Sequence, residues 1–149
     1  MNALARFVAS PALIRVCRIA VGLVMLVAAL AKIGNPAALA TQIVHYHVIP
    51  AGPENLVAVT LPWVELLTGL ALVSGVRARS GAWLAVAMMV LFTLSVAQAM
   101  ARGLDFECGC FGTADATRVG VKKLLENLAL TGAALAGSQR TGRVQRLKS

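Results

Sequence analysis

Four long apolar stretches, separated by short polar or helix-breaking segments, account for most of this chain. They cover residues 19–34, 56–76, 81–101 and 124–137. A helix needs about 20 apolar residues to cross a bilayer, so the second and third stretches are long enough by themselves. The first and fourth are shorter, but basic side chains at their flanks can extend them because long cationic side chains reach along lipid to the headgroups. The pattern predicts an all-α, polytopic membrane protein with a four-transmembrane-helix bundle.

Helix-breaking residues mark the connections between these stretches. Asn35 and Pro36 end the first predicted span, and prolines within residues 50–53 indicate a loop after it. Ser74 and Gly75, together with Gly81, predict a tight turn between the second and third spans. We therefore expect the loops to be short and the spans to be neighbours in one bundle.

Composition agrees with a protein whose solvent is lipid. The chain has 149 residues, of which 58% are hydrophobic and 13% are charged, and its mean hydropathy is +0.78. No stretch remains for a soluble domain, so residues 1–149 are predicted to form a single transmembrane domain with a basic tail at 138–149.

The amino end also has features of a secretory signal. Arg15 and Arg18 precede an apolar run, and Ala29–Ala31 resembles a cleavage site. Because Lys32 and Ile33 continue the helical pattern past that site, we favour retention of this segment as the first span.

Lysine and arginine are distributed unevenly between the two sides that four crossings would create. With both termini on one side, nine cations lie on that side and five on the other. The nine are Arg6, Arg15, Arg18, Arg77, Arg79, Arg140, Arg143, Arg146 and Lys148; the five are Lys32, Arg102, Arg118, Lys122 and Lys123. Since basic loops near span ends are retained in the cytoplasm, we expect a multi-pass protein of the inner (plasma) membrane with both termini cytoplasmic.

The net charge of +8 also bears on the choice of partner. Its cations are spread over two membrane faces without an aromatic and basic platform, which argues against nucleic acid. The lipid bilayer, with its anionic headgroups, is the expected partner.

A pair of cysteines separated by one residue lies between the third and fourth spans. Cys108 and Cys110 enclose Gly109, and Gly112 follows; the two glycines give the backbone the freedom that a tight loop needs. By the predicted topology this loop is periplasmic or extracellular, where disulfides form and persist. A strained, exposed disulfide is typically labile and redox-active, so we interpret the pair as a catalytic thiol pair.

Two other interpretations of this pair stay open. The cysteines could form a permanent structural disulfide or remain reduced, although bridging so short a loop contributes little to stability. Cys108 and Cys110 could also bind zinc or copper together with His45 and His47, which lie on the same predicted side. The spacing of these four residues does not match a zinc signature, so metal binding ranks below redox exchange.

Ionisable residues inside the predicted spans are a second set of candidates. Glu65 lies near the middle of the second span, where a lone carboxylate is costly and by default indicates function. Lys32 is its most obvious partner, although it lies toward the outer end of the first span and has to reach inward. The two residues are predicted to form an intramembrane ion pair or a proton relay.

The fourth stretch carries further polar and small residues. Lys122 and Glu126 are spaced to pair along a helix, and Gly132 with Ala136 predicts close approach of a neighbouring helix. Cys17, alone in the first span, is interpreted as a small buried hydrophobic residue.

Several of these residues together resemble a known family. The chain is similar to the MauE-like branch of the DoxX-like membrane protein superfamily over residues 18–135. The matching residues are Arg18, Gly22, Leu23, Val24, Ala29–Ile33, Asn35, Pro36, Tyr46, Pro50, Pro62–Leu66, Gly69, Gly75, Arg77 and Cys108–Gly112.

This resemblance implies a function as well as a fold. It implies four transmembrane helices and a part in maturing the disulfide-rich small subunit of methylamine dehydrogenase, an exported client, beside a periplasmic thioredoxin-like protein. Because the chain has one outward cysteine pair, a quinone enters only as an indirect electron acceptor. We therefore predict a membrane thiol-disulfide maturation factor; the alternative is a non-catalytic assembly scaffold or metal-binding protein.

Overall fold

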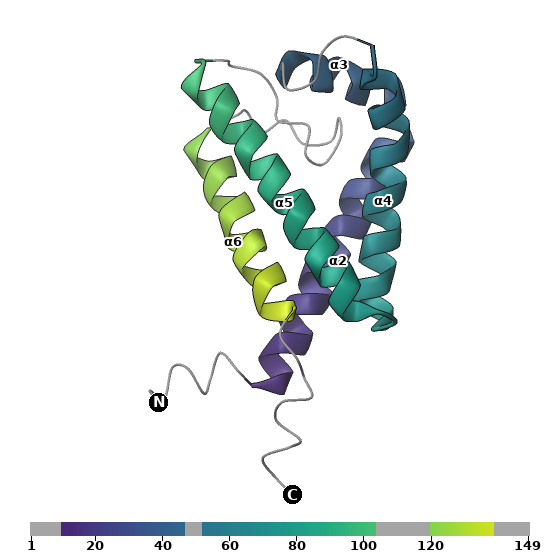
Figure 1. Cartoon of the computed structure of the whole chain (residues 1–149), viewed down its shortest axis with the longest axis vertical. Coiled ribbons are helices and arrows are strands. Elements are labelled where there is room, and N and C mark those ends of the chain that lie inside the picture. The colour runs from purple at the N-terminus through teal and green to yellow at the C-terminus, as the bar shows by residue number, and fades with distance from the viewer. Residues whose placement is uncertain (1–9, 47–51, 104–119, 139–149) are drawn as a thin grey trace, which may run out of the picture.

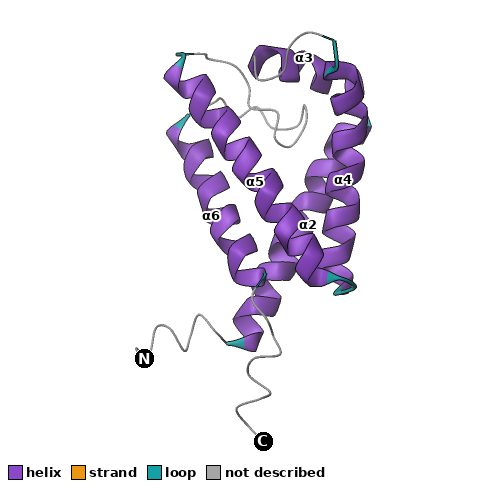
Figure 2. Ribbon diagram, viewed as in Figure 1, coloured by secondary structure: helices purple, strands orange, loops and turns teal. Residues whose placement is uncertain are grey.

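Five helices and their short connections make up the part of the chain that the computed structural model describes, residues 10–46, 52–103 and 120–138. They are α2 (Pro11–Ile33), α3 (Pro36–Tyr46), α4 (Glu54–Ser74), α5 (Ala78–Ala101) and α6 (Val121–Gly137). These residues contain no strand (Figure 2). The prediction of an all-α protein is confirmed for them.

Four of the helices run along the length of the molecule, and α3 lies across one end (Figure 1). At this α3 end, α2 and α5 finish while α4 and α6 begin. At the opposite end, α2 begins, α6 finishes, and a turn connects α4 to α5. We call it the arginine end because Arg15, Arg18, Arg77 and Arg79 lie there. The connection that carries Cys108 and Cys110 therefore starts and finishes at the α3 end.

Three of the helices are long and apolar enough to cross a membrane, namely α2, α4 and α5, with 23, 21 and 24 residues. The chain is thus a multi-pass membrane protein. Helix α2 begins well before the predicted first span because Pro11 occupies its first turn and the Ser10 hydroxyl accepts a hydrogen bond from the Leu13 amide at 3.3 Å. Helix α6 has 17 residues, a length of roughly 25 Å, so a fourth crossing stays a prediction.

Helix α3 occupies part of the segment that the sequence analysis assigned to a loop, and that assignment is wrong for Pro36–Tyr46. The Asn35 side chain accepts a hydrogen bond from the Ala38 amide at 3.1 Å and so caps the helix. Leu39 and Ala40 are buried with Ala58 of α4. A short amphipathic helix therefore covers this end of the bundle.

The tight turn predicted near Ser74 is present. Gly75 ends α4 in the left-handed conformation (φ 79°), and Arg77 also has a positive φ of 50°. Gly81 does not belong to this turn, because it lies inside α5, where a Cβ would approach Ala71 Cβ at 3.2 Å. Gly75 forms the turn, whereas Gly81 allows α5 to pack closely on α4.

Helices α2 and α4 approach each other closely at Gly22 and Gly69. A Cβ on Gly69 would lie 2.8 Å from both the Gly22 carbonyl oxygen and Leu26 Cγ, too short for any real side chain. Close backbone approach between small residues is a common source of helix association in lipid. The two glycines therefore fix the register of α2 against α4.

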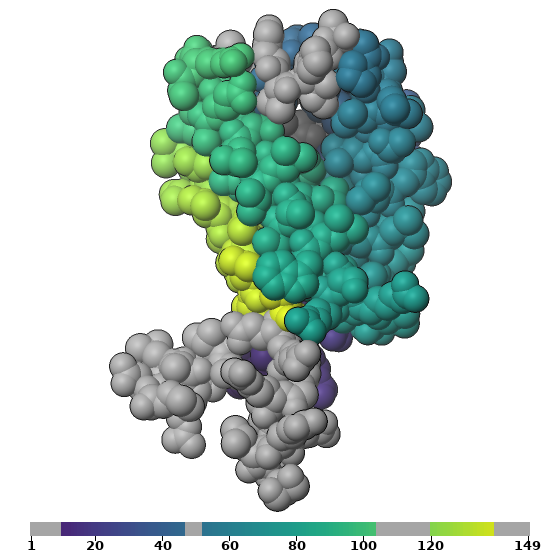
Figure 3. Space-filling model, viewed as in Figure 1, coloured from purple at the N-terminus to yellow at the C-terminus, as the bar shows by residue number. Residues whose placement is uncertain are grey.

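An apolar core fills the bundle on both sides of this crossing. Helix α5 lies between α4 and α6 in the space-filling view (Figure 3). The alanine, valine and methionine side chains of α5 pack against side chains of α2, α4 and α6. The buried members of the core are Val21, Met25, Leu72, Ala82, Ala85, Val86, Met88, Met89 and Ala134.

Candidate functional site

Lys32 on α2 and Glu65 on α4 are charged residues on the buried faces of their helices. On α4 the buried residues Ala58, Pro62, Glu65, Gly69 and Leu72 recur every three or four positions, which is the spacing of one helix face. On α2 the inward face ends at Lys32, after Met25 and Ala28. Glu65 and Lys32 thus stand where an apolar residue would ordinarily pack.

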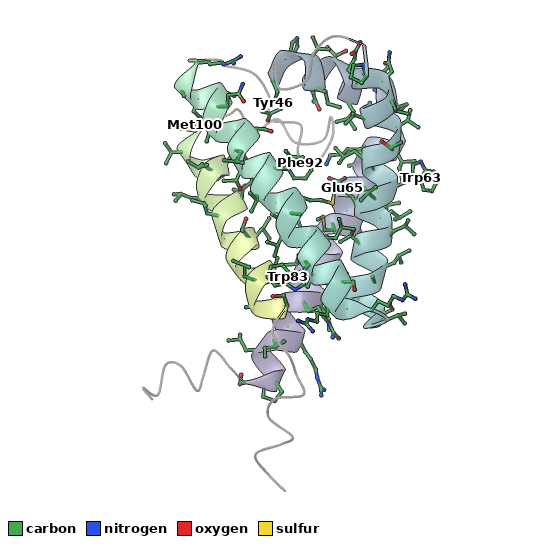
Figure 4. All side chains as sticks on the ribbon, in the orientation of Figure 1. Tyr46, Trp63, Glu65, Trp83, Phe92 and Met100 are labelled. Atoms are coloured by element: carbon green, nitrogen blue, oxygen red, sulfur yellow. The ribbon has the colours of Figure 1, made fainter. Side chains whose placement is uncertain are left out.

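The structure brings these two side chains into contact. Lys32 Nζ donates a hydrogen bond to Glu65 Oε1 at 2.6 Å, and the two residues are 3% and 0% exposed. Lys32 Nζ also lies 5.1 Å from the centre of the Phe92 ring on α5, within the range of a cation–π interaction. Phe92 and Glu65 project into the interior from facing helices (Figure 4).

Helix direction explains how an end residue of α2 reaches a middle residue of α4. If the Gly22–Gly69 crossing sets the register, the Lys32 backbone lies about 9 Å nearer the α3 end than that of Glu65. Side chains tilt toward the amino end of their helix. Because α2 and α4 are antiparallel, Lys32 tilts inward and Glu65 tilts toward it, so a long side chain closes the gap.

One carboxylate oxygen of this ion pair has no partner among the residues that the structure describes. Glu65 Oε2 is buried and accepts no hydrogen bond within the described residues. Burying a charged pair is costly unless its remaining atoms are also bonded, so the free oxygen is an available acceptor for a water molecule or a proton. Chemically, the pair can hold a proton on either the amine or the carboxyl side without changing its net charge.

A second polar group lies on α6 and was assigned to the wrong lysine. Lys123, not Lys122, forms the ion pair with Glu126, at 3.3 Å. Lys123 and Asn127 are buried at 2% and 4% exposure, while Lys122 is exposed. They lie four residues apart on the inward face, but Lys122 and Glu126 have the same spacing, so spacing alone does not identify the inward pair. Asn127 Nδ2 is buried and donates no hydrogen bond within the described residues.

Most of the predicted thiol or metal site lies outside the described residues. Cys108, Gly109, Cys110, Gly112 and His47 all belong to the segments that the structure does not describe. His45 is exposed in the last turn of α3. The described residues hold no cluster of three or more His, Cys, Asp or Glu that could bind a metal ion.

Two further predictions on small residues can be compared with the structure. Gly132 faces open space, so the prediction that it admits a neighbouring helix is wrong within this bundle; Gly137 instead lies against Arg18, where a Cβ would be 3.3 Å from Arg18 Cα. Cys17 is a free, partly buried thiol.

The chain is therefore a helical, multi-pass membrane protein whose interior contains a buried lysine–glutamate ion pair. Comparison with known proteins then gives the family. The family model described as "Methylamine utilisation protein MauE" matches residues 10–139. The "Methylamine utilization protein MauE" of Paracoccus denitrificans is 31% identical over 134 residues, which cover 89% of this chain and 72% of that relative. The chain belongs to the MauE family, and no solved structure matches it.

Proposed function

We propose that this chain is a membrane-embedded maturation factor of methylamine utilisation that exchanges disulfides with exported clients through Cys108 and Cys110. One observation carries the proposal: a Cys-Gly-Cys sequence connects α5 and α6 at the α3 end, opposite the arginine-rich end of the bundle. By the distribution of basic residues, the α3 end faces the periplasm, where client proteins acquire their disulfides.

The proposed reaction is a thiol-disulfide exchange. A client thiolate attacks one sulfur of the Cys108–Cys110 disulfide, whose S–S bond breaks as a mixed disulfide forms. A second client thiolate then attacks the client sulfur of the mixed disulfide and releases the other cysteine. The client loses two electrons, the cysteine pair gains two, and the two client thiol protons are balanced by the two cysteine thiols formed.

The cycle requires an oxidant to restore the cysteine disulfide. A thioredoxin-like periplasmic protein in its disulfide form would supply it by the same exchange chemistry, and a quinone would accept the electrons only further along the chain of carriers. The disulfide-containing small subunit of methylamine dehydrogenase is the proposed client. The Lys32–Glu65 pair is proposed to relay protons for the exchange at Cys108 and Cys110.

The redox state of the two cysteines tests this proposal directly. In cells that express a Cys17→Ser variant, a membrane-impermeant alkylating reagent is applied with and without prior reduction, and labels are counted by mass shift. We expect no label before reduction and two after it. Cys108→Ser and Cys110→Ser variants should each show one label without reduction and lose client disulfide formation.

Two results would contradict the proposal. Two labels without prior reduction in oxidising medium would show stable free thiols and would leave the scaffold or metal-binding function. Normal client disulfide formation in the Cys108→Ser variant would show that the pair is not part of the exchange. The chain that retains Cys17 is the matched control. Cys17 lies within α2 toward the arginine end, so the impermeant reagent should add no further label to it.

A further inference from the structure

The arginine end of the bundle contains cations without acidic residues. The segments 1–18, 74–80 and 138–149 include no Asp or Glu. The six acidic residues of the chain all lie elsewhere, at Glu54, Glu65, Asp105, Glu107, Asp115 and Glu126. The described residues of this end, 10–18, 74–80 and 138, therefore carry cations with no acidic side chain among them.

Arg18 lies where three elements meet at this end. A Cβ on Gly75 would be 3.4 Å from Arg18 Nη2, so the guanidinium lies against the α4–α5 turn. A Cβ on Gly137 would be 3.3 Å from Arg18 Cα, so the last residue of α6 packs on the Arg18 backbone. The side chain is thereby held between α2, the turn and the end of α6.

The Arg18 side chain is held there without a hydrogen-bond acceptor. Its Nε atom is buried and has no hydrogen-bond partner in the described part of the chain. A guanidinium has five N–H donors in a fixed fork, and leaving a buried donor unpaired costs free energy. An acceptor with two or more anionic oxygens would satisfy such a fork.

Neighbouring side chains suit one kind of ligand. Arg15 lies one turn before Arg18 on α2, and Arg77 follows Gly75 by two residues; both are exposed. Beside them, the apolar residues Val16 and Val76 are 62% and 68% exposed. Cationic donors next to exposed apolar surface, at the ends of membrane-spanning helices, match a phosphate that carries acyl chains.

We propose that Arg18, with Arg15 and Arg77, binds the phosphate of an anionic phospholipid at the arginine end. The phosphate oxygens accept from the guanidinium groups, while the acyl chains lie on the apolar surface of α2 and the α4–α5 turn. Basic pockets between helices on the cytoplasmic side are a recurrent form of lipid headgroup site. The bound lipid would tie α2, α4 and α6 together at this end.

A purely structural role for Arg18 is the alternative interpretation. The carboxyl ends of α4 and α6 carry partial negative charge that attracts a cation. In that case, loss of Arg18 would destabilise the protein equally in every lipid. A lipid site instead makes the effect of Arg18 depend on the headgroup.

Trp83 supplies a built-in probe for the test. It lies in the second turn of α5, near the arginine end, and is 52% exposed. The full chain carrying Trp63→Phe is placed in bilayers of brominated phosphatidylcholine, which quenches Trp83 fluorescence, and phosphatidylglycerol is titrated against it. Recovery of fluorescence gives the preference for the anionic lipid. Unfolding midpoints are measured in both lipids.

We expect phosphatidylglycerol to displace phosphatidylcholine preferentially and Arg18→Gln to reduce this preference about fivefold, the factor expected for one cation at the surface. Arg102→Gln removes the same charge at the α3 end and should leave the preference unchanged. Inorganic phosphate should not restore quenching if the acyl chains are needed for binding; if it does, a free-anion site replaces the lipid site.

Equal binding of the two lipids by the parent chain would overturn the proposal. So would an Arg18→Gln variant whose midpoint falls equally in both lipids, because this result assigns Arg18 a structural role alone. If Arg18→Gln does not fold, Arg15→Gln and Arg77→Gln decide the question, since both side chains are exposed. An unchanged lipid preference in both variants would contradict the site.

Discussion

The two halves of the bundle interior differ in chemistry. The half next to the arginine end, which we call the apolar half, packs residues such as Val21, Met25 and Leu72 against the small residues of α5. The half that extends to the α3 end, the polar half, buries Lys32, Glu65, Lys123 and Asn127. Both halves pack apolar side chains, with Leu39, Ala40 and Ala58 among them at the α3 end, but the buried ionisable side chains of the described residues lie in the polar half.

The two halves therefore differ in how much their buried residues are expected to contribute to the stability of the fold. In lipid, close contact between small residues can hold helices together without charge, and the Gly22–Gly69 crossing does so here. Buried ionisable groups, by contrast, are costly and often not required for stability. Their concentration on the side of the Cys108 loop favours a functional role for the polar half over a structural one.

The largest effect is expected from breaking the ion pair on one side only. Glu65→Leu leaves the Lys32 ammonium buried without its carboxylate, and such a change typically costs about 3–5 kcal/mol. Adding Lys32→Met removes the orphaned charge and should restore most of the lost stability. The measurement is the unfolding midpoint of each purified variant in detergent, followed by circular dichroism.

The outcome of this pair of variants also sharpens the functional interpretation. If the double variant is as unstable as Glu65→Leu, the ion pair is itself a structural requirement and the comparison between the two halves fails. Glu65→Gln then separates the roles: normal abundance with loss of client thiol oxidation indicates a proton relay, whereas loss of both indicates a structural contact.

A smaller effect is expected at the helix crossing. Gly69→Ala places a Cβ 2.8 Å from the Gly22 carbonyl oxygen, and overpacking of this kind costs about 1–3 kcal/mol. Gly132→Ala is the matched control, because no atom lies within 4 Å of its added Cβ and alanine favours helix over glycine. The unfolding midpoint should fall for Gly69→Ala and stay unchanged or rise for Gly132→Ala. Equal shifts of the two midpoints would show that α2 and α4 do not cross at Gly22 and Gly69.

The sequence predicted the helices better than their mutual contacts. Apolar length alone identified α4 and α5, and the Ser74–Gly75 turn followed from the conformational freedom of glycine. Helix α3 was missed because only 11 residues form it, too few for an apolar-length criterion, although Asn35 followed by Pro36 is a recognisable helix start. A short covering helix is therefore indicated by its capping residues and not by apolar length.

Contacts between helices depend on rotation about each axis, which spacing constrains only partly. Lys32 and Glu65 were suggested as partners because a lone carboxylate inside a span needs a counter-charge, and helix spacing did not enter that prediction. On α6, Lys122 and Lys123 are adjacent in sequence, and only the rotation of the helix decides that Lys123 faces inward. The position of Arg18 against Gly75 likewise follows from the tertiary arrangement of three elements and has no local sequence signal.

The smallest effect on stability is expected at Asn127 in the polar half. Its Nδ2 is buried without a hydrogen-bond acceptor in the described residues, so Asn127→Leu removes an unsatisfied donor and should change stability by less than about 1 kcal/mol. Client disulfide formation is then measured beside the unfolding midpoint. Unchanged stability with reduced activity would place Asn127 in the functional interior, because an apolar residue of similar size satisfies the fold. A fall of the midpoint comparable to that of Gly69→Ala would instead show that the amide stabilises the bundle, and the contrast between the two halves would not extend to α6.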